Sequence, residues 1–103
     1  MTIEDLQAIF EKHNDEYIKF ERVTPKLSQY ADLHAFLLLE KLLPLTDAAC
    51  VGRDMVSAAE HDEIYLNVDL GELAEVIAED QVVELARCGV RYKSEYDCLA
   101  MFV

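Results

Sequence analysis

A chain of 103 residues can build one modest hydrophobic core but not two, so a single domain over residues 1–103 is predicted. The hydrophobic share of 52% argues against an intrinsically disordered chain, although the formal net charge is -12 at pH 7. Such a negative surface repels phosphate backbones and anionic lipid head groups, which disfavours direct binding to nucleic acid or to a membrane.

The compartment and the absence of cofactors are predicted from the termini and the cysteines. The three cysteines have no C-x-x-C spacing and are odd in number, so neither a disulfide framework nor a zinc site is indicated. The N-terminus lacks the basic start and apolar run of a signal peptide, and the most apolar stretch is too short to span a bilayer. We therefore expect a cytoplasmic protein with no cofactor and no bound metal.

The chain begins with a helix signal. Thr2 is followed three residues later by Asp5, a variant of the capping box, and apolar residues recur behind it at helical intervals. This pattern predicts a first helix over about residues 3–20. Residues 21–30 have no sustained period and contain a proline, so they are predicted to form a loop.

The most apolar stretch, residues 32–43, predicts the second helix. Asp32 can cap its N-terminus, and Pro44 disfavours a helical residue before it and so marks the end. At helical spacing the apolar side chains cover nearly the whole circumference, leaving a narrow polar stripe of His34 and Lys41. We expect a core helix, around which the rest of the chain is organised.

Two strands are predicted after this helix. Residues 54–58 are a weak candidate, and residues 63–68 are a stronger one because apolar and polar residues alternate along them. The polar link 59–62 is typical of a hairpin. A third helix is capped by Asp69 with Glu72 three residues on.

A fourth helix and a final strand complete the expected fold. The helix covers about residues 79–88 and ends at Gly89, and the apolar run 98–103 follows a turn through residues 93–95 as a central strand buried on both faces. The prediction is an α+β fold with two N-terminal helices packed on a small, mostly antiparallel three-stranded sheet, and two short helices before the last strand. If that strand lay at the sheet edge it could pair across a homodimer, so a self-assembling structural protein remains an alternative.

Charge is unevenly distributed, because residues 54–86 contain ten acidic residues and no Lys or Arg. Solubility alone accounts for such a surface. The functional alternative is an acidic face that engages a basic or nucleic-acid-binding protein, with carboxylates imitating phosphates. Four of the acids fall at intervals of three, three and four residues and predict a carboxylate ridge on the third helix: Asp69, Glu72, Glu75 and Glu79.

The densest group of candidate ligands is Glu60, His61 and Asp62. Imidazole and carboxylates can hold a divalent metal or transfer a proton, which favours a small metal-dependent or acid–base enzyme as the alternative function. Neighbours on an extended chain point to alternate sides, so a polar turn with a hydrogen-bonded His explains the group equally well. His34 could join it through His61 together with Asp62 or Asp32, although nothing in the sequence brings them together.

The cysteines offer one further catalytic hypothesis. Cys88 has Arg87 and Arg91 close in sequence, and neighbouring cations lower the pKa of a thiol. Cys98 lies in an apolar run and is expected to be a small core residue. No established catalytic or phosphate-binding motif occurs in the chain.

Four segments carry a family resemblance: residues 32–39, 57–66, 88–92 and 99–103. Together they resemble a group of short acidic proteins encoded in tailed-phage and prophage genomes. The resemblance implies a bacterial cytoplasm as the setting and an accessory role in binding a host or phage protein, and it implies no activity and no catalytic residue. The leading prediction is therefore a protein–protein interaction module whose acidic region faces the partner.

Overall fold

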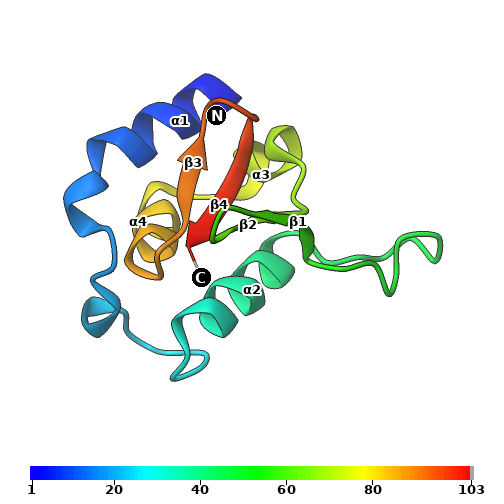
Figure 1. The fold of residues 1–103 in the computed structure, drawn as a ribbon, viewed down its shortest axis with the longest axis horizontal. Helices are drawn as coiled ribbons and strands as arrows, with labels where there is room; N and C mark the ends of the chain where they lie inside the picture. The colour runs from blue at the N-terminus through cyan, green and yellow to red at the C-terminus, as the bar shows by residue number, and fades with distance from the viewer. Residues whose placement is uncertain (103) are drawn as a thin grey trace.

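Four helices pack against one face of a four-stranded antiparallel sheet (Figure 1). The computed structural model describes residues 1–102. The helices are α1 (Ile3–Lys12), α2 (Ala31–Leu42), α3 (Leu70–Val76) and α4 (Glu79–Arg87), with short 3-10 turns η1 (Asn14–Glu16) and η2 (Phe20–Arg22). The strands are β1 (Val56–Glu60), β2 (Glu63–Leu66), β3 (Arg91–Lys93) and β4 (Cys98–Phe102).

The sheet has the order β1-β2-β4-β3, so the final apolar run is a central strand, as predicted. The predicted number of three strands is wrong, because β3 also pairs with β4 through Arg91 opposite Ala100 and Lys93 opposite Cys98. β3 has only three residues, too few for its alternation of polar and apolar side chains to give a strand signal, and the turn begins one residue later than predicted. Since β4 is not at an edge, the form of self-assembly that required it there is wrong. Val103 lies outside the described residues.

The first helix is shorter than predicted. The capping box is present, with Asp5 N–H donating to Thr2 Oγ1 and Thr2 N–H donating to Asp5, but α1 ends at Lys12 rather than near residue 20. Ile18 has a φ of 59°, a left-handed conformation that a β-branched residue rarely adopts. Its N–H donates to the Ala86 carbonyl of α4, so a contact distant in sequence replaces the helical bond.

α2 is buried on one side only, which corrects the prediction of a wholly interior helix. His34, Ala35, Leu38 and Leu39 are buried, whereas Leu33 is 44% exposed. α2 lies along one end of the molecule (Figure 1), so its outer side has nothing packed against it in that view. The helix begins at Ala31, before the predicted cap, and ends two residues before Pro44.

The predicted Asp69 cap and the glycine after α4 are confirmed, whereas the return bond from the Glu72 side chain that would complete a capping box is not present in residues 1–102. Asp69 Oδ1 accepts from Glu72 N–H at 3.0 Å and caps α3. α4 ends at Arg87, and Gly89 follows with a φ of 94° while Val90 N–H returns to the Leu85 carbonyl at 3.0 Å. A residue with a side chain would be strained at Gly89, which explains the glycine.

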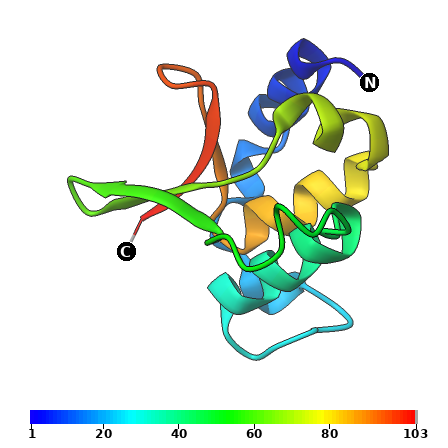
Figure 2. The same ribbon diagram turned by 90° about the vertical axis from the view of Figure 1, so that its right-hand side faces the viewer.

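The β1–β2 hairpin projects from the helical layer (Figure 2). β1 covers residues 56–60 rather than 54–58, and the turn consists of His61 and Asp62, whose φ values are 52° and 64°. Two consecutive positive φ values are the geometry of a tight two-residue hairpin, for which Asn and Asp are better suited than His. The link is therefore two residues long, rather than the four residues that the sequence predicted.

The core lies between the helices and the inner face of the sheet. Alternation along β2 and β4 sends Leu66, Leu99 and Met101 into it and leaves the intervening side chains on the outer face. Those outer side chains are Glu63 and Tyr65 on β2, with Ala100 and Phe102 beside them on β4. Within residues 1–102 no helix has the length and apolar character needed to cross a membrane.

Candidate functional site: an acidic hollow beside the third helix

The four acids of the predicted ridge do not share one helix. Asp69 is the N-cap of α3 and Glu72 and Glu75 follow within it, but the chain becomes extended at Ile77 and Glu79 starts α4. The continuous ridge is therefore wrong, because the intervals of three and four residues cross a break between two short helices. All four carboxylates still belong to exposed residues.

Glu79 is already neutralised by α1. Lys12 Nζ lies 3.1 Å and His13 Nε2 lies 2.7 Å from its Oε2. Hydrogen bonds from His13 and then from Lys12 hold the pKa of Glu79 below its usual value. Glu79 thus ties α4 to α1, and its charge is less available to a partner than that of Glu72 or Glu75.

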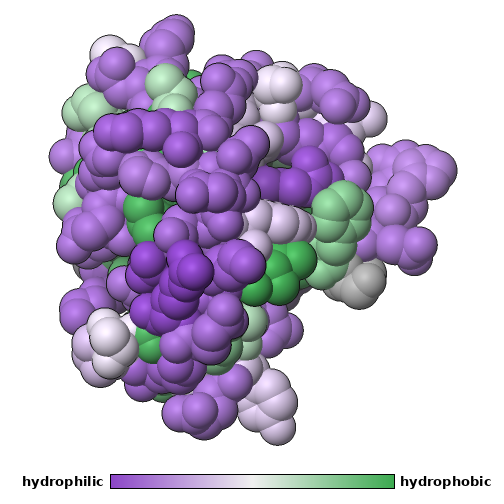
Figure 3. Space-filling model, turned by 90° about the vertical axis from the view of Figure 1, so that its left-hand side faces the viewer, coloured by the Kyte–Doolittle hydropathy of each residue, from purple (hydrophilic) through white to green (hydrophobic). Residues whose placement is uncertain are grey.

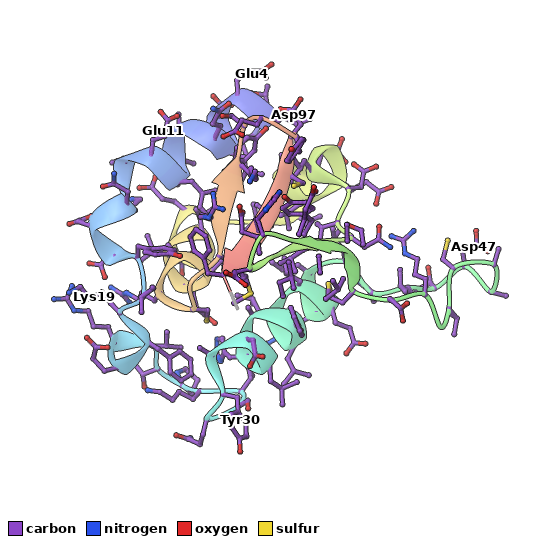
Figure 4. The ribbon with its side chains drawn as sticks, in the orientation of Figure 1. Glu4, Glu11, Lys19, Tyr30, Asp47 and Asp97 are labelled. Carbon is purple, nitrogen blue, oxygen red and sulfur yellow. The ribbon has the colours of Figure 1, made fainter. Side chains whose placement is uncertain are left out.

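Asp69 and Glu72 instead line a hollow of about 310 Å³. We call it the acidic hollow. Its walls come from the end of α2, from the 43–55 segment and from the link between β2 and α3. Asp47 marks the tip of the 43–55 segment, which extends away from the helices and the sheet (Figure 4).

The acidic hollow combines an apolar floor with a carboxylate rim. Its apolar lining includes Leu39, Leu43 and Val68. Its charged lining residues are Glu40, Asp54, Asp69 and Glu72, with Arg53 as the single base. A second hollow of about 510 Å³ continues it outward and shares Arg53, Asp69 and Glu72.

The rim carboxylates form no salt bridge within residues 1–102, although Arg53 lines the same hollow. Within residues 1–102, neither Asp54, Asp69 nor Glu72 takes part in a salt bridge, and the same holds for Glu40. Asp69 accepts a backbone hydrogen bond as the cap of α3, but keeps its charge at the surface. Four carboxylates around an apolar floor suit a cation carried on an aliphatic stem, such as the side chain of Lys or Arg.

Glu60, His61 and Asp62 do not form a convergent site. They lie at the tip of the β1–β2 hairpin, where His61 is 87% exposed and 3.7 Å from its neighbour Glu60. Across residues 1–102 no three His, Cys, Asp or Glu side chains are grouped so that they could hold a metal ion. These residues form a polar turn, as that interpretation expected, but the His61 ring has no hydrogen bond within residues 1–102.

His34 is fully buried and has a different partner from those considered from the sequence. Its Nδ1 accepts from Leu27 N–H at 3.0 Å, so its proton is on Nε2, which donates to Glu84 Oε2 at 2.5 Å. Both ring nitrogens of His34 therefore have hydrogen-bond partners. Asp32, which the sequence offered as a partner for His34, accepts from Leu33 N–H instead. His34 therefore joins α2, α4 and the preceding loop as a structural residue.

The cysteine hypothesis fails at Cys88. Burial, with a smaller effect of Glu84, raises the pKa of its thiol to about 12, so the thiolate is scarce at neutral pH. The Arg87 guanidinium does not approach the thiol and instead lies 2.8 Å from Glu16. Burial also raises the pKa of Cys98.

The outer face of the sheet carries a charged cluster that sequence reasoning missed. Glu63 is only 7% exposed and forms salt bridges with Arg91 and with Lys93, whose Nζ lies 2.6 Å from Oε1. The Lys93 ammonium also lies over the rings of Tyr65 and Tyr96. The alternation along β2 did place Glu63 on this face, but its partners belong to the strand that was not predicted. The cluster covers the small Ala100 side chain opposite. Its Arg91 Nε is buried and has no hydrogen-bond partner within residues 1–102.

The geometry described above can be compared with known proteins. No family model, curated protein or solved structure matches this chain. A function can therefore be inferred only from the chemistry of the acidic hollow and the surfaces around it, and the resemblance to phage-encoded proteins stays a prediction.

Proposed function

We propose that this chain is a small non-enzymatic accessory protein that binds a basic partner protein through the acidic hollow. The supporting observation is the set of rim carboxylates that form no salt bridge within the described residues and lie around an apolar floor. Elsewhere Glu16, Glu63, Glu79 and Glu84 have partners within the fold. Following the resemblance, the setting is the cytoplasm of a bacterium that carries a phage.

The chemistry of the hollow favours a cationic side chain as the part that enters. A Lys or Arg stem would cover Leu39, Leu43 and Val68 while its head remains at the carboxylate rim. The rest of residues 54–86 adds exposed acids and no base, which would accelerate association with a basic surface. A nucleic-acid-binding protein is one partner with such a surface, and the present chain would occupy its phosphate-binding side.

The experiment is affinity purification from lysogenic or phage-infected bacteria with matched charge reversals. The test variant combines Asp54→Lys and Glu72→Lys, which reverse rim charges and leave the Asp69 cap intact. The control is Glu95→Lys with Glu21→Lys, which makes the same change in net charge at exposed positions outside the hollow. We expect the test variant to lose a partner that the parent and the control retain.

The second measurement is the salt dependence of the affinity for any partner that is recovered. Exposed charge pairs are screened over about 8 Å at 0.15 M ionic strength, so the affinity of the parent should fall steeply with added salt. The affinity of the test variant should be at least tenfold weaker at low salt, equivalent to about 1.4 kcal/mol. Equal recovery of every partner by parent and test variant would contradict the proposed function.

A further inference from the structure

A second groove lies on the other side of the molecule, between α1, α4 and β3, and has a volume of about 420 Å³. We call it the edge groove. Its apolar lining includes Phe10 of α1, Val90 and Tyr92, and the rings of Phe10 and Tyr92 lie 6.5 Å apart. Pale and apolar atoms interrupt the hydrophilic surface on this side of the molecule (Figure 3).

The edge groove follows the free edge of β3. Tyr92 is on the inner face of the sheet, where it packs against the core, whereas Arg91 and Phe102 are on the outer face, with the guanidinium 4.5 Å from the ring centroid. All three residues line the groove. A groove lined by side chains from both faces of a sheet must pass around the edge of that sheet, which here is β3.

The backbone of that edge is unpaired in the described residues. β3 is the terminal strand of the sheet and forms a ladder only with β4. Among backbone hydrogen bonds outside the helices and strands, the only one that involves β3 is Tyr96 N–H to the Lys93 carbonyl within the following turn. An open strand edge offers N–H and C=O groups for an additional strand.

The charge of the edge groove contrasts with that of the whole chain. Within residues 1–102 its charged lining residues are Glu11 and Arg91, one of each sign, although the chain carries a net charge of -12. The remaining polar groups, including Gln7, Asn14 and Ser94, are neutral. An occupant of this groove is therefore selected by backbone hydrogen bonds and apolar contact rather than by its charge.

The other sheet edge lacks this arrangement. Residues 57–60 of β1 are exposed, and their side chains are small except for Glu60 at the end. β1 lies in the hairpin that projects from the helices (Figure 2), so no helix forms a wall beside it. Strand addition needs both main-chain pairing and pockets for alternate side chains. Within residues 1–102, β3 has both, whereas neither the acidic hollow nor the edge groove is lined by a residue of β1.

We propose that the edge groove binds an extended, uncharged segment of another protein, which pairs with β3 as a fifth strand. Its alternate side chains would be apolar and would contact Phe10 and Tyr92. Since β3 has three residues and a strand advances about 3.3 Å per residue, the segment recognised would be about three to five residues long. This binding is independent of the acidic hollow and of the proposed function.

The test uses the full chain, labelled with ¹⁵N, and a blocked hexapeptide of alternating threonine and valine as the probe. We expect saturable chemical-shift changes at the amides of Arg91, Tyr92 and Lys93, with slower hydrogen exchange of the β3 amides whose N–H points outward. Two N-methylated peptides distinguish main-chain pairing with β3 from non-specific apolar contact. Methylation of the N–H groups on one peptide edge should weaken binding at least tenfold, while methylation on the opposite edge should not.

A substitution that fills the edge groove tests the proposal from the side of the protein. Asn14→Trp would place a large ring in the edge groove and should weaken peptide binding at least tenfold. The matched control is Ala8→Trp in the middle of α1, because Ala8 is also exposed but does not line the groove; this variant should bind the peptide as the parent does. No shift change at millimolar peptide, or equal effects of both methylated peptides, would overturn the proposal. Concentration-dependent shifts at β3 without peptide would also overturn it, by assigning the groove to a second copy of this chain.

Discussion

The carboxylates of this protein fall into two groups that behave differently. Glu63 and Glu84 are paired with groups from distant parts of the chain and hold the fold together. Asp54 and Glu72 line the acidic hollow and form no salt bridge within residues 1–102. The difference teaches that charge density along the sequence does not distinguish a structural acid from a binding acid, since both kinds occur in residues 54–86.

The largest expected effect is at Glu63. Glu63→Gln removes the carboxylate that forms salt bridges with Arg91 and Lys93, whose side chains are 28% and 12% exposed. Removing one partner of a buried ion pair typically costs about 3–5 kcal/mol, and we expect a loss near the lower value because Arg91 is partly exposed. Urea unfolding measures this loss.

The matched control for Glu63 is Glu60→Gln, the residue opposite it in the β1–β2 ladder. Glu60 is exposed and its only ion-pair neighbour within the described chain is the exposed His61. The change should alter the free energy of unfolding by less than about 0.5 kcal/mol. Equal losses at the two positions would mean that the cluster with Arg91 and Lys93 contributes nothing specific.

The second effect concerns His34. His34→Leu leaves Leu27 N–H without its acceptor and Glu84 without its donor, so we expect a loss of about 2–3 kcal/mol in the free energy of unfolding. Glu84→Gln keeps an oxygen that can accept the Nε2 proton and should cost about 1 kcal/mol or less. Chemical denaturation of both variants checks the order, and a larger loss for Glu84→Gln would contradict the assigned position of the proton.

The third effect is a dependence on pH at Glu16. Hydrogen bonds from Arg87 and then from Arg22 lower the pKa of Glu16 below its usual 4.5. Because the folded pKa is lower than the unfolded one, the stabilisation is fully present above pH 4.5 and is lost as the pH falls through the folded pKa. Between about pH 6 and pH 3 the free energy of unfolding should fall less steeply with decreasing pH for Glu16→Gln than for the parent. An unchanged slope would mean that the arginines do not stabilise this carboxylate in solution.

Local signals in the sequence explain which parts of the fold were predictable. The Thr2 and Asp69 caps, the stop before Pro44 and the left-handed Gly89 depend on a few neighbouring residues, and each is present. The end of α1 was not predictable in this way, because Ile18 bonds to Ala86, far along the chain. β3 was missed for the same reason, since only its pairing with β4 makes three residues a strand.

The candidate sites show the same difference between what neighbouring residues indicate and what contacts between distant parts of the chain decide. The sequence marked Asp69 and Glu72 as exposed acids, but the hollow they line also needs the end of α2 and Asp54, which folding brings together. His34 was marked as a polar residue in need of a partner, yet Glu84 lies 50 residues away. Composition identifies the chemical groups, and only the packing of the elements decides which groups meet.

The smallest expected effect on stability is at the acidic hollow, and it is the sharpest test of the difference between the two groups of acids. Asp54→Asn with Glu72→Gln removes two rim charges that form no salt bridge within residues 1–102. Their removal relieves like-charge repulsion, so the free energy of unfolding should stay within about 0.5 kcal/mol or rise slightly. Urea unfolding would measure this beside the binding of a basic partner, which the same variant should weaken. A loss above about 1 kcal/mol would place these acids with Glu63 as structural residues and would remove the reason for assigning them to a partner.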